Sequence, residues 1–286
     1  MYFKIGDNIV IGSKDSPYKL EPGISGLAQA DIRTGDGLYA GVDGGYVSSQ
    51  LYGMRTITFT GFYLPDSCEN ADELRVRLLT ELHIRYLYPI FIKTFAGHNY
   101  FTEGYLTDIK ADINGPRPNE FQLTFLCPDP IIYDGGDGVN SDSAWMEQTF
   151  YAPGAGGFEI KYTSPVLWEG GEPATVVNNI GTVNTYPIIT LRGNYHNPTI
   201  TNLTTGDFIT ISRNISSTDT VTIDMKQRII TLTDSGGNVT SIASDRTITS
   251  SWWYLIPGEN KIQLTTTDVS DTDYGMIKYK QGFQGI

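Results

Sequence analysis

Oxygen-bearing side chains are most concentrated between residues 134 and 142. Asp134, Asp137, Asn140 and Asp142 lie there among glycines. Calcium takes several oxygen ligands in flexible loops, so these residue types suit a calcium site. The spacing misses the Asp-x-Asp-x-Asp-Gly pattern of the common calcium loop, and glycine with aspartate is equally typical of a solvated linker. The linker interpretation is favoured, and the sequence predicts no metal or other cofactor.

Other groups that could catalyse a reaction are scattered along the chain. Asp219, Asp224 and Glu259 could in principle supply a glycosidase pair, which needs two acids facing each other across a cleft. Acids on alternating strands mostly face water, however, and no phosphate-binding loop, zinc-protease motif or nucleophile elbow occurs. The three histidines, which lack metal-ligand spacing, are His83, His98 and His196. The sequence therefore predicts that the protein is not an enzyme.

Three consecutive aromatic residues, Trp252, Trp253 and Tyr254, could stack against a sugar ring. They precede Leu255, and on a strand at least one of the three must point inward. Core packing is therefore the favoured interpretation, and carbohydrate contact by these residues is the alternative. The run from Tyr195 to Pro198 faintly resembles a galectin sugar site, but the matching arginine is missing.

Composition indicates a globular, β-dominated protein. The chain has 286 residues, of which 40% are hydrophobic and 18% charged, and its 31 glycines and 14 prolines favour short strands joined by tight turns. The net charge is −12, which argues against nucleic-acid binding. No apolar run is long enough to span a bilayer, so no membrane partner is predicted. Cys127 ends an apolar strand face and is expected to be a buried thiol, and neither it nor Cys68 has ligand spacing.

The first 133 residues are predicted to form one β domain with a single helix. Ile57, Phe59 and Tyr63 alternate with threonines on a strand. A helix is expected to start at Asn70 as its N-cap, with Leu74, Leu78 and Leu82 on one face. Further strands are expected at 90–95, 100–109 and 121–127, the last of them ended by prolines. Residues 1–54 are expected to add short strands separated by glycine-rich turns.

Beyond residue 133 the pattern changes twice. Residues 134–158 are rich in glycine and aspartate and are predicted to be a linker. Residues 159–286 contain short alternating segments, for example 187–192, 208–212, 220–225 and 228–233, separated by turn residues. This spacing is typical of a β-sandwich domain.

The order of these features resembles the distal tail proteins of bacteriophages with long, non-contractile tails, the siphovirus tail-tip or baseplate hub family. The matching segments in the first half are Arg55–Gly61, the leucine-rich helix, Tyr88-Pro89, Phe121–Pro130 and Tyr133. Those in the second half are Val177–Gly181, Tyr186–Ile189, Asn197–Ile200, Thr204–Gly206, Ile223-Asp224 and Leu255–Asn260. The resemblance implies a mainly β protein, with an N-terminal β-barrel or sandwich and one α-helix, followed by a galectin-like or carbohydrate-module-like β-sandwich.

The resemblance also implies a function. A homo-hexameric ring in the virion would join the end of the tail tube protein to the tail-tip hub protein and to receptor-binding proteins, with DNA passing through its centre. A ring needs interfaces that close by rotation, and Leu38, Tyr39 and Tyr46 are the predicted interface residues because they are apolar or aromatic among turn residues. The alternative is a carbohydrate-binding module that recognises host cell-surface polysaccharide through the C-terminal sandwich.

Overall fold

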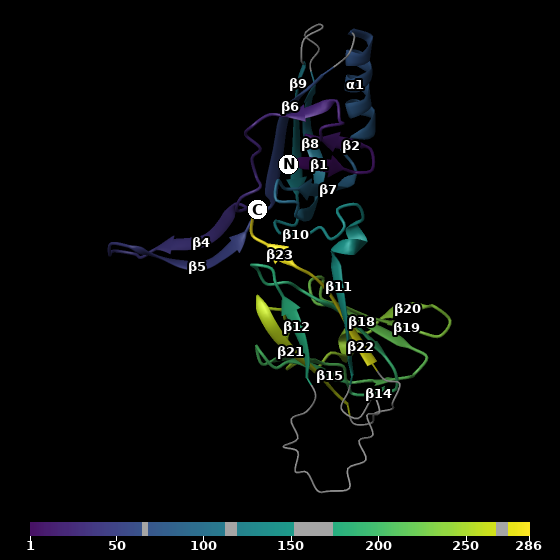
Figure 1. Ribbon diagram of the computed structural model, residues 1–286. Coiled ribbons are helices and arrows are strands. Elements are labelled where there is room, and N and C mark those ends of the chain that lie inside the picture. Colours follow the sequence, from purple (N-terminus) through teal and green to yellow (C-terminus); the bar gives the residue numbers. More distant parts are fainter. Residues whose placement is uncertain (65–67, 112–118, 152–173, 267–273) are drawn as a thin grey trace. The chain divides into compact units, whose positions relative to one another are not determined.

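The computed structural model describes residues 1–64, 68–111, 119–151, 174–266 and 274–286 (Figure 1). These residues form two compact units. Unit 1 contains Met1–Ala144 together with Gly282–Ile286, and unit 2 contains Trp145–Gln281. The predicted fold class, mainly β with one α-helix in the described part of the chain, is confirmed.

Unit 1 is built on a closed sheet. Pairing between β8 and β9 closes the strand order β8-β7-β1-β2-β3-β6-β9 into a barrel-like sheet, in which every pair except β2–β3 is antiparallel. Alternation of buried and partly exposed residues along β6 and β9 matches one face turned to a core. The strands are β1 (Tyr2–Ile5), β2 (Ile9–Ile11), β3 (Tyr18–Leu20), β6 (Arg55–Tyr63), β7 (Leu87–Lys93), β8 (Asn99–Ala111) and β9 (Asn119–Cys127).

Aromatic rings fill the interior of this sheet. The Phe3 and Phe59 ring centroids lie 4.6 Å apart, and those of Phe59 and Phe125 lie 6.0 Å apart, both in edge-to-face arrangements. Cys127 is buried in the same core, as its strand pattern predicted. Burial raises the pKa of its thiol to about 11. The core therefore holds a protonated and unreactive thiol.

The helix α1 (Cys68–Glu81) packs its leucine face on this core. Leu78 is buried and Leu74 is partly buried there, while Leu82, just beyond the helix end, is also buried. The Tyr18 hydroxyl donates a hydrogen bond of 2.8 Å to the Leu74 carbonyl. The helix begins at Cys68, so the prediction that Asn70 caps it was wrong. Buried Ala71 lies about two helical turns before Leu78 and so belongs to the same buried face of the helix.

Residues 134–144 pack within unit 1 instead of extending as a linker. The strand β10 (Ile132–Asp134) joins β8, and β23 (Gly282–Phe283) pairs with β10. A Cβ on Gly135 would lie within 2.9 Å of the Tyr100 backbone, and Gly136 has φ +53°. The glycines are there because the turn leading to η1 (Ser141–Ala144) approaches neighbouring backbone closely, so their role is steric and their number does not indicate flexibility.

Unit 2 has two sheets. The six-stranded sheet has the order β11-β22-β13-β18-β19-β20, and the four-stranded sheet has the order β12-β21-β15-β16. In the six-stranded sheet the bounds are β11 (Trp145–Tyr151), β22 (Tyr274–Lys280), β13 (Ile188–Arg192), β18 (Thr220–Asp224), β19 (Ile229–Thr233) and β20 (Val239–Ser241). The remaining elements are β12 (Thr175–Asn179), β21 (Gly258–Thr265), β15 (Thr199–Asn202), β16 (Asp207–Thr210), the short pair β14 (Tyr195–His196) and β17 (Asn214–Ile215), and η2 (Ala243–Asp245).

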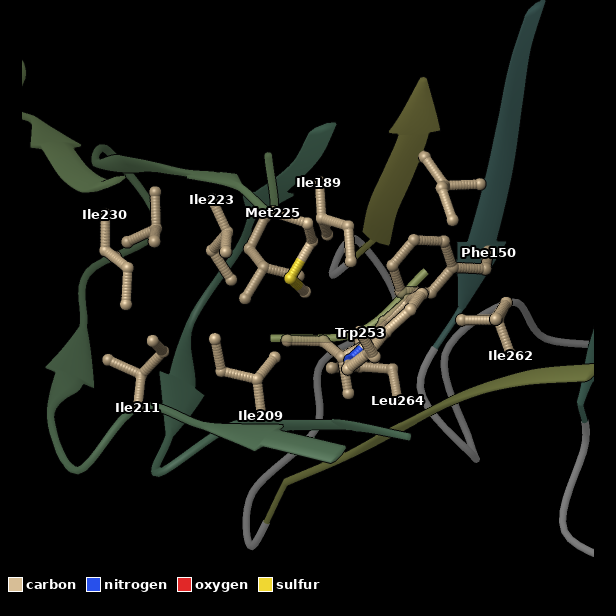
Figure 2. Close-up of a cluster of buried hydrophobic side chains, with 14 of the residues drawn as sticks. Phe150, Ile189, Ile209, Ile211, Ile223, Met225, Ile230, Trp253, Ile262 and Leu264 are labelled. Carbon is tan, nitrogen blue, oxygen red and sulfur yellow. The ribbon is translucent and has the colours of Figure 1, made fainter. Parts of the chain in front are cut away.

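The core of unit 2 lies between these two sheets. Figure 2 shows Ile189 and Ile223 from the six-stranded sheet facing Ile209 and Leu264 from the four-stranded sheet, with Trp253 among them. Each of these side chains is at most 1% exposed. Unit 2 is therefore a β-sandwich with a core of its own. No helix in the described part of either unit is long and apolar enough to cross a membrane.

Candidate assembly surface

A two-stranded hairpin, here called the arm (residues 32–52), is the most exposed element of unit 1. Its strands β4 (Ile32–Leu38) and β5 (Gly45–Tyr52) pair from Ile32↔Tyr52 to Leu38↔Gly45, with a bulge between Gly35 and Asp36. No other described strand pairs with either edge, and Figure 1 shows the hairpin reaching away from the barrel. Unpaired strand edges can bind another chain by adding a strand.

The arm is apolar on both faces although it is solvent-exposed. Leu38 is 88% exposed, Tyr39 51% and Tyr46 50%. Further exposed apolar side chains on the same hairpin are Ile32, Val47 and Leu51. A concentration of exposed apolar side chains of this kind is typical of a protein-binding surface.

The structure brings the three predicted interface residues together. The Tyr39 and Tyr46 ring centroids lie 5.8 Å apart, and Leu38 lies on the strand position next to Gly37, which pairs with Tyr46. A Cβ on Gly37 would lie 2.8 Å from the end of the Tyr46 ring, so glycine leaves the space that this ring occupies. Their role in an interface stays a prediction. Ile32, Val47 and Leu51 were not predicted as interface residues, although they lie on the two strands that the same turn joins.

The base of the arm is held by a buried charged residue. Arg55 is 1% exposed, and it follows the arm at the start of β6. Its Nε donates to the Pro130 carbonyl at 2.7 Å, Nη1 to Gly26 at 2.5 Å and Nη2 to Gln284 at 2.5 Å. Nη1 also donates to the Ala28 carbonyl. Burial lowers the pKa of this guanidinium, and the ring of carbonyl acceptors is what makes its charge tolerable there.

The three aromatic residues considered as carbohydrate contacts in unit 2 lie in different environments. Trp253 is 1% exposed and belongs to the core, so its inclusion among carbohydrate contacts was wrong and core packing is the correct interpretation. Trp252 is half-buried, with the Arg246 guanidinium 5.5 Å from its ring centroid. Tyr254 packs edge-on against Tyr186 at 5.8 Å. Carbohydrate contact by Trp252 and Tyr254 stays a prediction.

The oxygen-rich loop uses its side chains to stabilise its own turns. Asp137 Oδ1 accepts hydrogen bonds from the Asn140 amide at 3.0 Å, the Ser143 hydroxyl at 2.7 Å and the Val139 amide at 2.8 Å. These bonds lower the pKa of Asp137. Asp134 Oδ1 likewise accepts from the Gly136 amide at 2.8 Å. Among the described residues no group of three or more His, Cys, Asp or Glu side chains is arranged to hold a metal ion.

The acids considered for a glycosidase pair lie on different elements. Asp224 lies in the six-stranded sheet, where its carboxylate accepts from the Lys226 and Gln227 amides at 2.9 and 2.8 Å. Glu259 lies on β21 of the four-stranded sheet, and Asp219 precedes β18. Asp224 therefore stabilises a turn, and its sheet is not that of Glu259.

Comparison with known proteins is informative for both units. Residues 180–283 match the family model described as siphovirus-type tail component, C-terminal domain. The solved structure of SPP1 Dit (gp 19.1), described as a paradigm of the hub adsorption apparatus in phages infecting Gram-positive bacteria, aligns with a TM-score of 0.66 at 18% identity. That alignment covers 98% of this chain and 99% of that chain. No curated protein matches the chain.

Two further solved structures cover nearly the whole chain. The phage P2 baseplate in its activated conformation with Ca gives a TM-score of 0.49 at 12% identity, and the form with Sr gives 0.47 at 10% identity. Each alignment covers 97% of both chains. The resemblance to siphovirus distal tail proteins is confirmed, since residues 180–283 match the siphovirus-type tail component and the chain shares its fold with SPP1 Dit.

Proposed function

We propose that this chain, whose residues 180–283 match the siphovirus-type tail components, is a structural protein of the phage tail tip that associates with copies of itself into a ring. The single observation that carries the self-association is the arm. Its two free strand edges and its exposed Leu38, Tyr39 and Tyr46 have no partner in the described part of the chain to cover them. Permanent interfaces between subunits are larger and more apolar than transient ones, which suits this surface.

The contact is heterologous in this proposal, because the arm of one copy binds a different surface of the next. Such contacts generate a ring when the rotation closes, and six copies would suffice by analogy with the family. The ring would join the tail tube protein to the tail-tip hub protein and receptor-binding proteins. The net charge of −12 also suits a conduit, since an acidic wall repels the DNA phosphates that slide past it.

The proposal is tested by imaging the purified protein and by measuring its mass in solution. Negative-stain electron microscopy at micromolar concentration should show rings with a central opening, and sedimentation should give the copy number. The double variant Tyr39→Asp with Tyr46→Asp should give a folded protein that no longer assembles, because two buried carboxylates would oppose the apolar contact.

A matched control places the same charges on unit 2. Val239 and Ile248 are 64% and 97% exposed there, so Val239→Asp with Ile248→Asp adds two charges at exposed apolar positions away from the arm. This control should assemble as the unaltered protein does. Normal assembly of the tyrosine double variant would remove the arm from the interface.

A further inference from the structure

The chain segments on either side of the arm meet at one guanidinium. The arm starts just after Gly26 and Ala28, whose carbonyls accept from Arg55, and it ends just before Arg55 itself. At the base of the hairpin the Gly53 amide donates to the Asp31 carbonyl at 2.6 Å. Because β4 and β5 pair only with each other among the described strands, these few contacts at the base set the direction in which the arm points.

A third segment reaches the same point from far along the sequence. Residues 282–286, here called the strap, follow unit 2 and return to unit 1. Phe283 pairs with Ile132, and the Ile286 amide donates to the Leu27 carbonyl at 3.0 Å. The strap also supplies the Gln284 carbonyl to Arg55 at 2.5 Å.

The strap lies directly against residues 27 and 28, which lead into the arm. A Cβ on Gly285 would lie 2.7 Å from the Ala28 carbonyl carbon and oxygen. Atoms approach so closely only where a glycine leaves the room. Residues 27 and 28 thus contact the strap, and the Ala28 carbonyl also accepts from Arg55. Upstream, Ser25 pairs with Thr58 of β6, so the contacts of the strap fall on residues 27 and 28, between that bridge and the arm.

We propose that the strap orients the arm, and that Arg55 is the positioning residue through which it does so. When the strap is absent or displaced, Arg55 loses one acceptor, residues 26–28 lose their backing, and the arm samples many directions. This inference rests on the proposed function, since it assigns a control to the same self-association surface. The strap follows unit 2 in the sequence, so a chain still being synthesised would present an arm that is not yet set for association.

The experiment measures the arm direction by pulsed electron paramagnetic resonance between two spin labels. Labels at Asp43→Cys, at the outer turn of the arm, and Lys110→Cys, at an exposed position of β8, are placed in a Cys68→Ser background. Labelled protein is diluted into an excess of unlabelled protein, so that only distances within one chain are recorded. Gly285→Ala displaces the strap, and Gly236→Ala is the matched control, because a Cβ there meets only side-chain atoms at 3.2 Å or more.

The parent and Gly236→Ala proteins should give one narrow distance distribution. Gly285→Ala, and a chain that stops after Gln281, should give a broad one, while the amide protons of β6 and β9 keep their protection from hydrogen exchange. Retention of the narrow distribution in either strap variant would overturn the proposal. Loss of protection throughout β6 and β9 in Gly285→Ala would also overturn it, because the strap would then support the barrel and not the arm in particular.

Assembly of the same proteins separates this inference from the proposed function. Gly285→Ala should associate at least tenfold more weakly than Gly236→Ala in sedimentation. If the parent protein does not associate at all, self-association is refuted, whereas the distance distributions still decide whether the strap orients the arm.

Discussion

Arg55 shows how much one residue can hold in place. A hydrogen bond from a charged donor contributes about 1.5–3 kcal/mol, and a buried carbonyl that loses its donor costs about 1–3 kcal/mol. Arg55→Met removes donors from four carbonyls at once, so the free energy of unfolding of unit 1 should fall by at least about 3 kcal/mol. Denaturant unfolding followed by hydrogen exchange of the β6 amides would measure this loss.

The matched control for this prediction is Arg75→Met. Arg75 is an arginine on α1 whose Nε donates to the Ala111 carbonyl at 2.8 Å, so one bond is lost instead of four. The low end of that range, about 1.5 kcal/mol, is expected there because this bond is only partly buried. Equal losses in the two variants would show that convergence at Arg55 adds nothing.

Sequence reasoning succeeded and failed at the residue scale for identifiable reasons. Alternation correctly predicted that Phe59 and Cys127 face the core, because burial on a strand follows a period of two. The same period puts Arg55 on the buried face of β6, but it gave no sign that carbonyls surround the guanidinium. Those acceptors come from loops at residues 26, 28, 130 and 284, and nothing local in the sequence says that these loops converge.

The arm makes a prediction at the scale of one element. Gly37→Ala should push the Tyr46 ring from its place over the strand, because the new Cβ would lie 2.8 Å from the ring end and the ring can turn away. Self-association should weaken while the melting temperature of unit 1 stays within a degree or two, since the arm adds little to the barrel core. Sedimentation at several concentrations, with calorimetry alongside, would measure both.

Gly35→Ala is the control on the same hairpin. Its Cβ would first meet the hydroxyl ends of Ser48 and Ser49, and no aromatic ring is displaced. Association of this variant should match that of the parent. If Gly35→Ala weakened association as much as Gly37→Ala did, arm stiffness and not the Tyr46 ring would control the contact.

Elements were predicted well where a core imposes a period and poorly where none does. The segment 187–192 became β13 (Ile188–Arg192) and 228–233 became β19 (Ile229–Thr233), because one face of each is buried. The arm has no buried face, so its residues carried no inside-outside signal and their aromatic content had to stand in for it. The glycines at 135 and 136 were interpreted as a sign of flexibility, because the close backbone approach that requires them cannot be seen in the sequence.

The charge of the whole molecule gives the last prediction. Each copy carries −12, so copies brought into a ring repel one another, and this repulsion is screened over about 10 Å at 0.1 M salt and about 3 Å at 1 M. An apolar arm contact has little ionic attraction to lose, so raising the salt concentration should tighten association several-fold. Sedimentation at about 0.1 M and about 1 M sodium chloride would measure the change. Weaker association at the higher concentration would mean that ion pairs hold the copies together, and the Tyr39 and Tyr46 contact would then be secondary.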